Sequence, residues 1–250
     1  MSSEKTDALI IRLADWSESS RVVTFFTREF GKISAVAKGA KRLKGPFEAA
    51  IDLLAICRIV FIRKSSGGLD ILTEAQLQQR FKPHGRNLLS LYGGYYVAEL
   101  LASFMEEYDP HPQLYDFAVR TLSSLSEEPD HKVTLLKFEL ALLRDTGHLP
   151  LFDACLSCGK PAEAGNGQFG FWVSQGGLIC HACQKKEFQP QPEIQPGTLA
   201  ILRRLSDENG DTFKNLQLSD QQHAEIRRIV TASIRHVLGR PSKMSRYLQL

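Results

Sequence analysis

The stretch from Arg21 to Ala37, RVVTFFTREFGKISAVA, holds two short runs rich in valine, isoleucine, phenylalanine and threonine on either side of a break at Phe30-Gly31. Such residues favour strands and glycine favours turns, so the stretch predicts two antiparallel strands. The same pattern extends outward in both directions, to Ala8 and to Leu77. The expected strands are Ala8–Leu13, Arg21–Thr27, Lys32–Ala37, Ile51–Ile62 and Leu69–Leu77, with further turns at Trp16–Ser20 and Ser65–Gly68.

Five strands in so short a segment suit a small closed barrel such as the OB-fold, and an SH3-like barrel fits the pattern nearly as well. After Phe81-Lys82-Pro83 the apolar residues recur at helical spacing, which predicts a domain boundary near Arg80–Gly85. The fold class is therefore α+β, with a barrel domain over residues 1–80 and a helical bundle domain over residues 81–250. One helix is expected to begin at Asn87, and two more are expected over Gln113–Leu125 and Lys132–Thr146.

A further helix is expected near the end of the chain. Ser219 to Gln222 resembles a capping box, and Gly239 with Pro241 would stop the helix. The intervening stretch Gln189–Pro196, rich in proline and glutamine, is interpreted as a connector.

Two Cys-x-x-Cys pairs, Cys155/Cys158 and Cys180/Cys183, are separated by 21 residues. Each pair on a tight turn offers two thiolates to one edge of a tetrahedron, so the two pairs predict one structural Zn²⁺ with four cysteine ligands. The apolar, glycine-bearing segment between the pairs resembles a hairpin, and a zinc ribbon is expected at about residues 151–187.

Other uses of these cysteines stay open. Redox dithiols or free thiols are the main alternative, and His181 could replace one cysteine as a ligand. A catalytic zinc is disfavoured because four thiolates leave no open coordination position. The fifth cysteine, Cys57, lies alone in the apolar run Leu53–Val60 and is expected in the core.

Bulk composition narrows the function only slightly. The net charge of +3 does not identify a nucleic-acid partner, because the clustering of charge matters more than its total. The polar start MSSEKTD predicts no export, so a cytoplasmic location is expected, and Glu99 interrupts the apolar stretch Leu88–Met105, which favours a buried helix over a membrane span. No catalytic motif is found, so no enzyme is predicted.

Positive charge gathers between Gly31 and Phe47, where the chain has five cations and no acid. The flanking glycines suit a loop that follows a phosphate backbone. A solvated loop would have the same composition, but a basic loop leaving a barrel strand, near phenylalanines that could stack bases or form the core, favours a DNA-binding groove. The predicted DNA-binding cations are Lys32, Lys38, Lys41, Arg42 and Lys44, and the aromatics are Phe25, Phe26 and Phe47.

Several stretches, by their order and spacing, together resemble RecO, the bacterial recombination mediator family. They are Trp16–Ser20, Thr27–Lys32, Val36–Arg42, Phe138–Leu143, the two cysteine pairs and Leu238–Arg246, the last with an inserted Met244. The resemblance spans nearly the whole chain. It implies an N-terminal OB-fold, a helical bundle with an embedded zinc ribbon, and no catalytic turnover.

The resemblance also implies a mechanism and partners. Such proteins bind single- and double-stranded DNA, anneal complementary strands, engage the acidic tail of the single-strand-binding protein, and act with RecR to help load RecA at the bacterial nucleoid. It places the site for that tail near Lys137. Two other hypotheses stay open: an RNA-binding or transcription-associated module, and an enzyme whose site assembles from dispersed residues.

Overall fold

The computed structural model of this chain describes residues 3–42, 47, 50–64, 67–85, 88–127, 131–163, 168–186, 192–207 and 217–248. The chain forms two compact units. One comprises Met1–Thr134 with Ser242–Gln249, and the other comprises Leu135–Pro241. The first unit thus includes the predicted barrel, the helices that follow it and a returning C-terminal segment.

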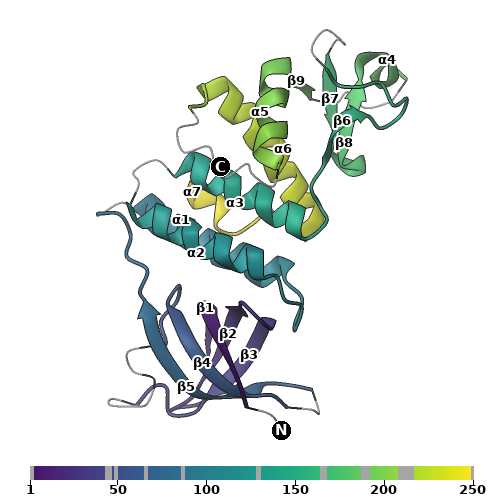
Figure 1. Cartoon of the computed structure of the whole chain (residues 1–250). Helices are drawn as coiled ribbons and strands as arrows, with labels where there is room; N and C mark the ends of the chain where they lie inside the picture. Colours follow the sequence, from purple (N-terminus) through teal and green to yellow (C-terminus); the bar gives the residue numbers. More distant parts are fainter. Residues whose placement is uncertain are drawn as a thin grey trace. The chain divides into compact units, whose positions relative to one another are not determined.

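The barrel closes in the strand order β1-β2-β3-β5-β4, in which β3 and β5 pair in parallel and the other described barrel strands pair antiparallel. This is the Greek-key arrangement of a five-stranded OB barrel, so the structure decides for the OB-fold over an SH3-like barrel. In Figure 1 the barrel is drawn in purple and blue. Its strands are β1 (Ser3–Asp15), β2 (Arg21–Thr27), β3 (Gly31–Ala37), β4 (Ile56–Ile62) and β5 (Asp70–Gln79).

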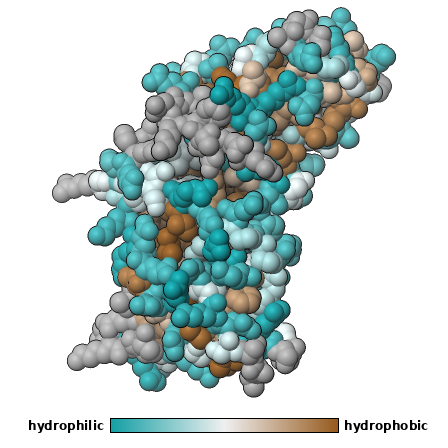
Figure 2. Space-filling view, in the orientation of Figure 1, coloured by the Kyte–Doolittle hydropathy of each residue, from teal (hydrophilic) through white to brown (hydrophobic). Residues whose placement is uncertain are grey.

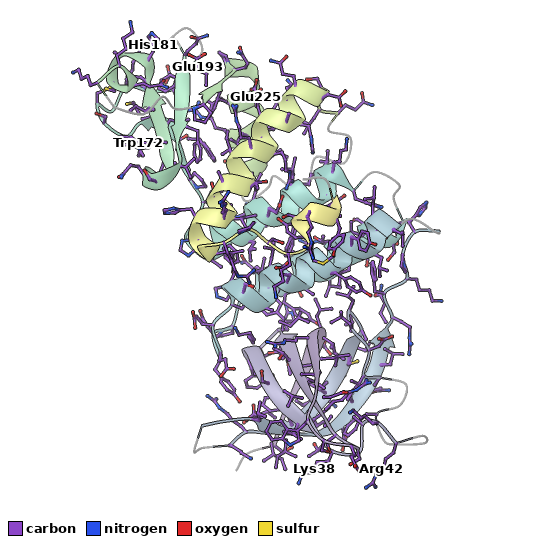
Figure 3. All side chains as sticks on the ribbon, turned by 180° about the vertical axis from the view of Figure 1, so that it is seen from behind. Lys38, Arg42, Trp172, His181, Glu193 and Glu225 are labelled. Atoms are coloured by element: carbon purple, nitrogen blue, oxygen red, sulfur yellow. The ribbon has the colours of Figure 1, made fainter. Side chains whose placement is uncertain are left out.

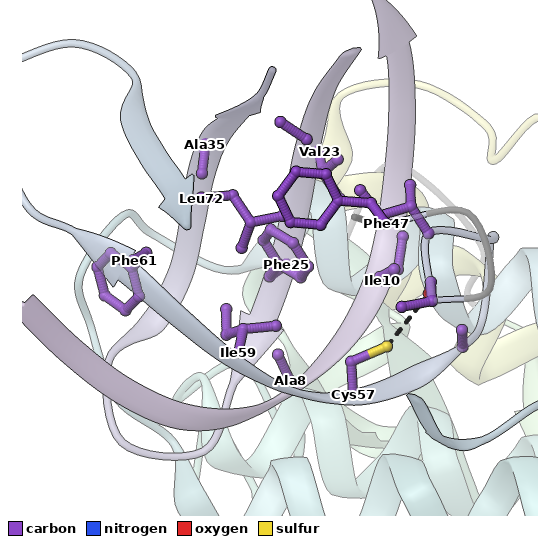
Figure 4. Close-up of a cluster of buried hydrophobic side chains, with 14 of the residues drawn as sticks. Ala8, Ile10, Val23, Phe25, Ala35, Phe47, Cys57, Ile59, Phe61 and Leu72 are labelled. Atoms are coloured by element: carbon purple, nitrogen blue, oxygen red, sulfur yellow. Dashed lines mark hydrogen bonds between the residues drawn. The ribbon is translucent and has the colours of Figure 1, made fainter. Parts of the chain in front are cut away.

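All three phenylalanines that were considered for base stacking are buried. Phe25 and Phe47 lie in the barrel core, where 0% and 4% of their surface is exposed (Figure 4). Phe26 is also fully buried but lies outside that core cluster, with its ring 5.9 Å from the ring of Tyr115. They therefore cannot receive a base, and the stacking alternative is wrong for them. Cys57 is buried in the same core, as predicted, and burial raises the pKa of its thiol to about 11.

Strand β4 begins five residues later than the apolar run predicted. Ile51 and Ala55 pack into the core from a loop, in which Leu54 adopts a left-handed φ of 66°. That loop crosses β1 and forms two hydrogen bonds with Ile10. Leu54 N donates to Ile10 O at 2.9 Å, and Ile10 N donates to Ala55 O at 3.0 Å. Apolar periodicity cannot separate a buried loop from a strand, since both bury their side chains.

Two helices of the first unit, α1 (Leu88–Phe104) and α2 (Pro112–Glu127), lie across one end of the barrel (Figure 1). Arg28 on the barrel forms a bidentate ion pair with Asp116 of α2, at 2.9 and 3.0 Å. Gly31 faces the backbone of Asp109 where a β-carbon would collide with the carbonyl oxygen, so only glycine fits. The predicted helix positions are confirmed.

The C-terminal segment joins the first unit through one carboxylate. Glu99 of α1 accepts hydrogen bonds from Ser242 Oγ at 2.7 Å, Lys243 N at 2.8 Å and Met244 N at 2.9 Å. The short helix α7 (Ser245–Leu248) follows, and the rings of Tyr92 and Tyr247 lie 5.3 Å apart. The inserted Met244 is thus part of the contact.

The second unit combines helices with a small sheet in the order β6-β8-β7-β9. Its helices pack around an ion pair between Arg227 and Glu139, 7% and 0% exposed, with both bonds at 2.6 Å. The elements are α3 (Lys132–Asp145, whose first turn belongs to the other unit), β6 (Leu151–Cys155), β7 (Phe169–Trp172), the 3₁₀ turn η1 (Val173–Gln175), β8 (Gly177–Cys180), α4 (His181–Gln184), β9 (Glu193–Ile194), α5 (Pro196–Ser206) and α6 (Asp220–Leu238).

Two sequence expectations for this unit have different outcomes. The capping box of Ser219 and Gln222 is confirmed, and Gly239 ends α6 in the left-handed conformation. The connector interpretation of Gln189–Pro196 is wrong for its described part, because Glu193–Ile194 form β9 and Pro196 begins α5. Proline is tolerated in a first helical turn, where its missing N–H has no partner to lose.

In the view of Figure 2 the barrel is mainly hydrophilic outside, as the alternation of buried and exposed residues along its strands requires. Within the described parts of the chain, no helix is both long and apolar enough to span a membrane.

Candidate metal centre and nucleic-acid interface

The four cysteines of the two pairs come together in the second unit. Cys155 ends β6, Cys180 ends β8, and Cys183 lies on α4. Gly159, at a φ of 71°, closes the turn that carries Cys158 by donating from its N–H to Cys155 O at 2.9 Å. The predicted hairpin between the pairs is confirmed as β7 and β8.

The geometry of the four sulfurs suits a tetrahedral metal. All four lie within 4.8 Å of one another, and Cys158 Sγ is 3.7 Å from Cys180 Sγ. Sulfurs at about 2.3 Å from a tetrahedral Zn²⁺ would be about 3.8 Å apart, whereas a disulfide needs about 2.0 Å. All four thiols are free, so the group could hold a metal ion. His181 is exposed and outside this group.

Backbone N–H groups next to the cluster act to lower the pKa of two of its thiols. Burial raises the pKa of Cys155, but N–H groups of Cys180, Cys158 and Ser157 outweigh burial and lower that pKa to about 6. Cys180 N lies 3.3 Å from the Cys155 sulfur. The Lys160 N–H lowers the pKa of Cys158, yet hydrogen bonds with the other sulfurs raise it overall to about 11. The surrounding N–H groups therefore favour the thiolate form of Cys155.

Lys38 and Arg42 of the basic loop lie at the end of the barrel that points away from α1 and α2 (Figure 3). Lys38 and Arg42 are both exposed there, and neither forms an ion pair with a described residue. They line one open groove with a volume of about 470 Å³. The other lining residues are Trp16, Ser17, Ser19, Ser20, Val36 and Gly39.

Lys41 has a different environment from its neighbours. Its ammonium group lies 2.9 Å from Asp15 Oδ2 and donates to Ser17 O at 3.0 Å, and its backbone N–H donates to Ser19 O at 3.1 Å. The hydrogen bond from Lys41 is the main cause of a lowered pKa at Asp15. Lys41 therefore ties the basic loop to the β1–β2 turn.

Of the other predicted binding cations, Lys32 lies away from this groove. Lys32 lies at the start of β3, six residues and hence about 20 Å along the strand from Lys38, and it donates to Ala102 O of α1 at 3.2 Å. Lys137 lies half-buried on α3 in the second unit. Lys44 falls outside the described residues.

Trp16 was expected only as part of a turn, and sequence reasoning missed its place in the groove. Its side chain is 62% exposed beside Lys38 and Arg42. A large aromatic residue in an otherwise polar turn, one strand away from a basic loop, was the signal that could have found it.

The fold and the sites together define a class of protein. Its members have an OB barrel with an open groove, followed by helices and a small ribbon whose four cysteines could hold a metal ion. Family models described as "Recombination protein O N terminal" and "Recombination protein O C terminal" match residues 1–81 and 85–246. The chain belongs to the RecO family. The two family models meet near residue 80, where the sequence placed a boundary. The division into compact units is different, because it puts the barrel together with α1 and α2.

Curated relatives agree with this assignment. Proteins named "DNA repair protein RecO" include one from Rhodopirellula baltica, 38% identical over 77% of this chain and 77% of the relative. One from Anaeromyxobacter dehalogenans is 32% identical over 99% of this chain and 96% of its own length. One from Listeria monocytogenes is 33% identical over 74% and 70%.

Proposed function

We propose that this chain is a non-catalytic, DNA-binding mediator of recombinational repair. It binds single- and double-stranded DNA at the outer end of the barrel, anneals complementary strands, and acts with RecR in the cytoplasm to help RecA replace the single-strand-binding protein. The observation that carries this proposal is the pair Lys38 and Arg42, two exposed cations that line one open groove and form no ion pair with a described residue. Membership of the RecO family and the names of the relatives support it.

The physical basis of annealing is the reduction of phosphate repulsion. Cations that contact phosphates without contacting base edges bind every sequence, so they lower the repulsion between two strands whatever those strands encode. Lys38 and Arg42 supply such contacts, and Lys41 holds the loop that carries them.

We assign one structural Zn²⁺ to the cysteine cluster. The ion would be held by Cys155, Cys158, Cys180 and Cys183, and it would supply a closed cross-link between β6, β8 and α4. Because the sheet around it is small, we expect the ion to stabilise the second unit. Half-buried Lys137, between the buried Leu136 and Phe138 on α3, is the proposed cation for the acidic tail of the single-strand-binding protein.

Strand annealing tests the proposal. Two complementary oligonucleotides carrying a donor and an acceptor dye are mixed with the protein, bare or coated with single-strand-binding protein, and the rate of energy transfer is followed. Acceleration by the parent chain and its loss in Lys38→Ala/Arg42→Ala are expected. The control Lys82→Ala/Lys243→Ala removes two exposed cations of the same unit outside the groove and should anneal normally.

The opposite results are equally clear. No acceleration by the parent chain, on either bare or coated strands, would refute the mediator function. Faster annealing of RNA than of DNA would favour the RNA-binding hypothesis instead.

A further inference from the structure

Trp16 is the large hydrophobic residue with the greatest exposure among the described residues, at 62%. An indole ring buries a large apolar area when it packs, so leaving it in water gives up a contribution that most tryptophans make to folding. Trp16 lies in the turn between β1 and β2, so its ring does not pack into the barrel core. Its position therefore points to a role outside the fold itself.

The turn that carries Trp16 is held rigidly. Trp16 N and Ser17 N both donate to Ser20 O, at 3.1 and 3.2 Å, and Ser20 N donates back to Ser17 Oγ at 3.1 Å. Lys41 adds hydrogen bonds to the carbonyls of Ser17 and Ser19 from the neighbouring loop. The backbone beneath the ring is thus fixed before any ligand arrives, which lowers the entropy cost of binding.

The charges around the ring favour an anionic ligand. Lys38 and Arg42 line the same groove as Trp16, and none of the described residues that line it is acidic. Asp15, next to Trp16, is paired with Lys41 at 2.9 Å and with Arg21 at 3.5 Å. Glu18 is exposed in the turn but is not among the groove residues. A flat aromatic face beside two cations matches a nucleotide, whose planar base and phosphate need these two kinds of contact.

We propose that Trp16 is a stacking platform for an unpaired base of single-stranded DNA. In this arrangement Lys38 and Arg42 bind the flanking phosphates, and Lys41 is a positioning residue that holds the Trp16 turn against the basic loop. The inference rests on the proposed function and deepens it. Bases in a duplex are already stacked on each other, so Trp16 makes this end of the barrel prefer single strands.

Affinity measurements with three DNA ligands test this role: a fluorescent oligo(dT), the same length of duplex, and a strand of abasic residues that has phosphates but no bases. Stacking of one base corresponds to about a 5- to 160-fold change in affinity. Trp16→Ala should lower affinity for oligo(dT) within that range and leave duplex and abasic affinities nearly unchanged. Trp16→Phe should restore part of the loss. Leu88→Ala, at a residue 60% exposed in the same unit, is the matched control.

A spectroscopic measurement reports the stacking directly. Trp16 and Trp172 are the two tryptophans, so a Trp172→Phe protein isolates the Trp16 emission, which oligo(dT) should quench and the abasic strand should not. Equal oligo(dT) affinity of Trp16→Ala and parent, or the absence of quenching while binding persists, would overturn the stacking role alone. A parent chain that binds no DNA would instead overturn the proposed function.

Discussion

The salt dependence of DNA binding tests which cations touch phosphate. Each phosphate contact changes the slope of log affinity against log salt by about 0.9 on duplex DNA and about 0.7 on single strands. Because Lys38 and Arg42 are exposed on the groove and form no ion pair with a described residue, Lys38→Ala/Arg42→Ala should flatten the slope by about 1.4 on single strands. Over a fourfold rise in salt, the variant should therefore lose about 7-fold less affinity than the parent.

Lys41 supplies the informative contrast. Its ammonium group is bound to Asp15 and to Ser17 O, so Lys41→Ala should leave the salt slope almost unchanged while weakening single-strand binding through the loosened turn. The measurement is fluorescence anisotropy of a labelled oligonucleotide at a series of salt concentrations, with circular dichroism to verify folding. Lys82→Ala/Lys243→Ala controls for the loss of two positive charges elsewhere in the unit.

Two results would contradict this assignment. A parental slope in Lys38→Ala/Arg42→Ala would show that the two cations do not bind phosphate. An equal flattening in Lys82→Ala/Lys243→Ala would show that only the total charge of the unit matters, and that the groove has no special part in binding.

Other predictions concern the fold and the metal centre. Glu139→Gln should lower the free energy of unfolding of the second unit by about 3–5 kcal/mol, because Arg227 would stay buried without its partner; urea denaturation measures this, and a loss below about 1 kcal/mol would contradict it. Zinc binding to the metal-free chain should release protons, since the pKa of Cys158 is raised to about 11 and the ion binds thiolates; a pH indicator in weak buffer detects them, and binding without release would be inconsistent. Cys158→Ser should release zinc and lower the thermal stability of the second unit while leaving the barrel folded, with metal analysis and calorimetry as the measurements. Gly31→Ala should destabilise the first unit by at least about 1–2 kcal/mol, because φ is +67° and the new methyl group meets Asp109 O; an unchanged unfolding midpoint would speak against that contact.

Much of the fold was predictable because its signals are local. The strands Arg21–Thr27 and Lys32–Ala37 follow from alternation and turn chemistry, and the structure places them within one residue of the prediction. The capping box at Ser219 depends on residues three apart. The cysteine spacing predicted a common site because two tight turns present two sulfurs each, and the four sulfurs do converge.

Other features depend on contacts between residues far apart in the sequence. The late start of β4 follows from a buried loop that crosses β1. Helix α5 escaped prediction because the proline that begins it resembled part of a connector. The grouping of the C-terminal segment with α1 depends on Glu99, more than one hundred residues earlier.

The candidate sites also combine features that were predictable from the sequence with features that depend on the fold. Composition and spacing were enough to predict that a basic loop leaves a small barrel and that four cysteines form one cluster. The fold was needed to learn that Phe25 faces the core, that Trp16 faces water, and that Lys41 has an acidic partner among the described residues while Lys38 has none. Exposure and pairing depend on which distant groups pack around a side chain, and in a closed barrel strand pairing across the whole domain sets those neighbours.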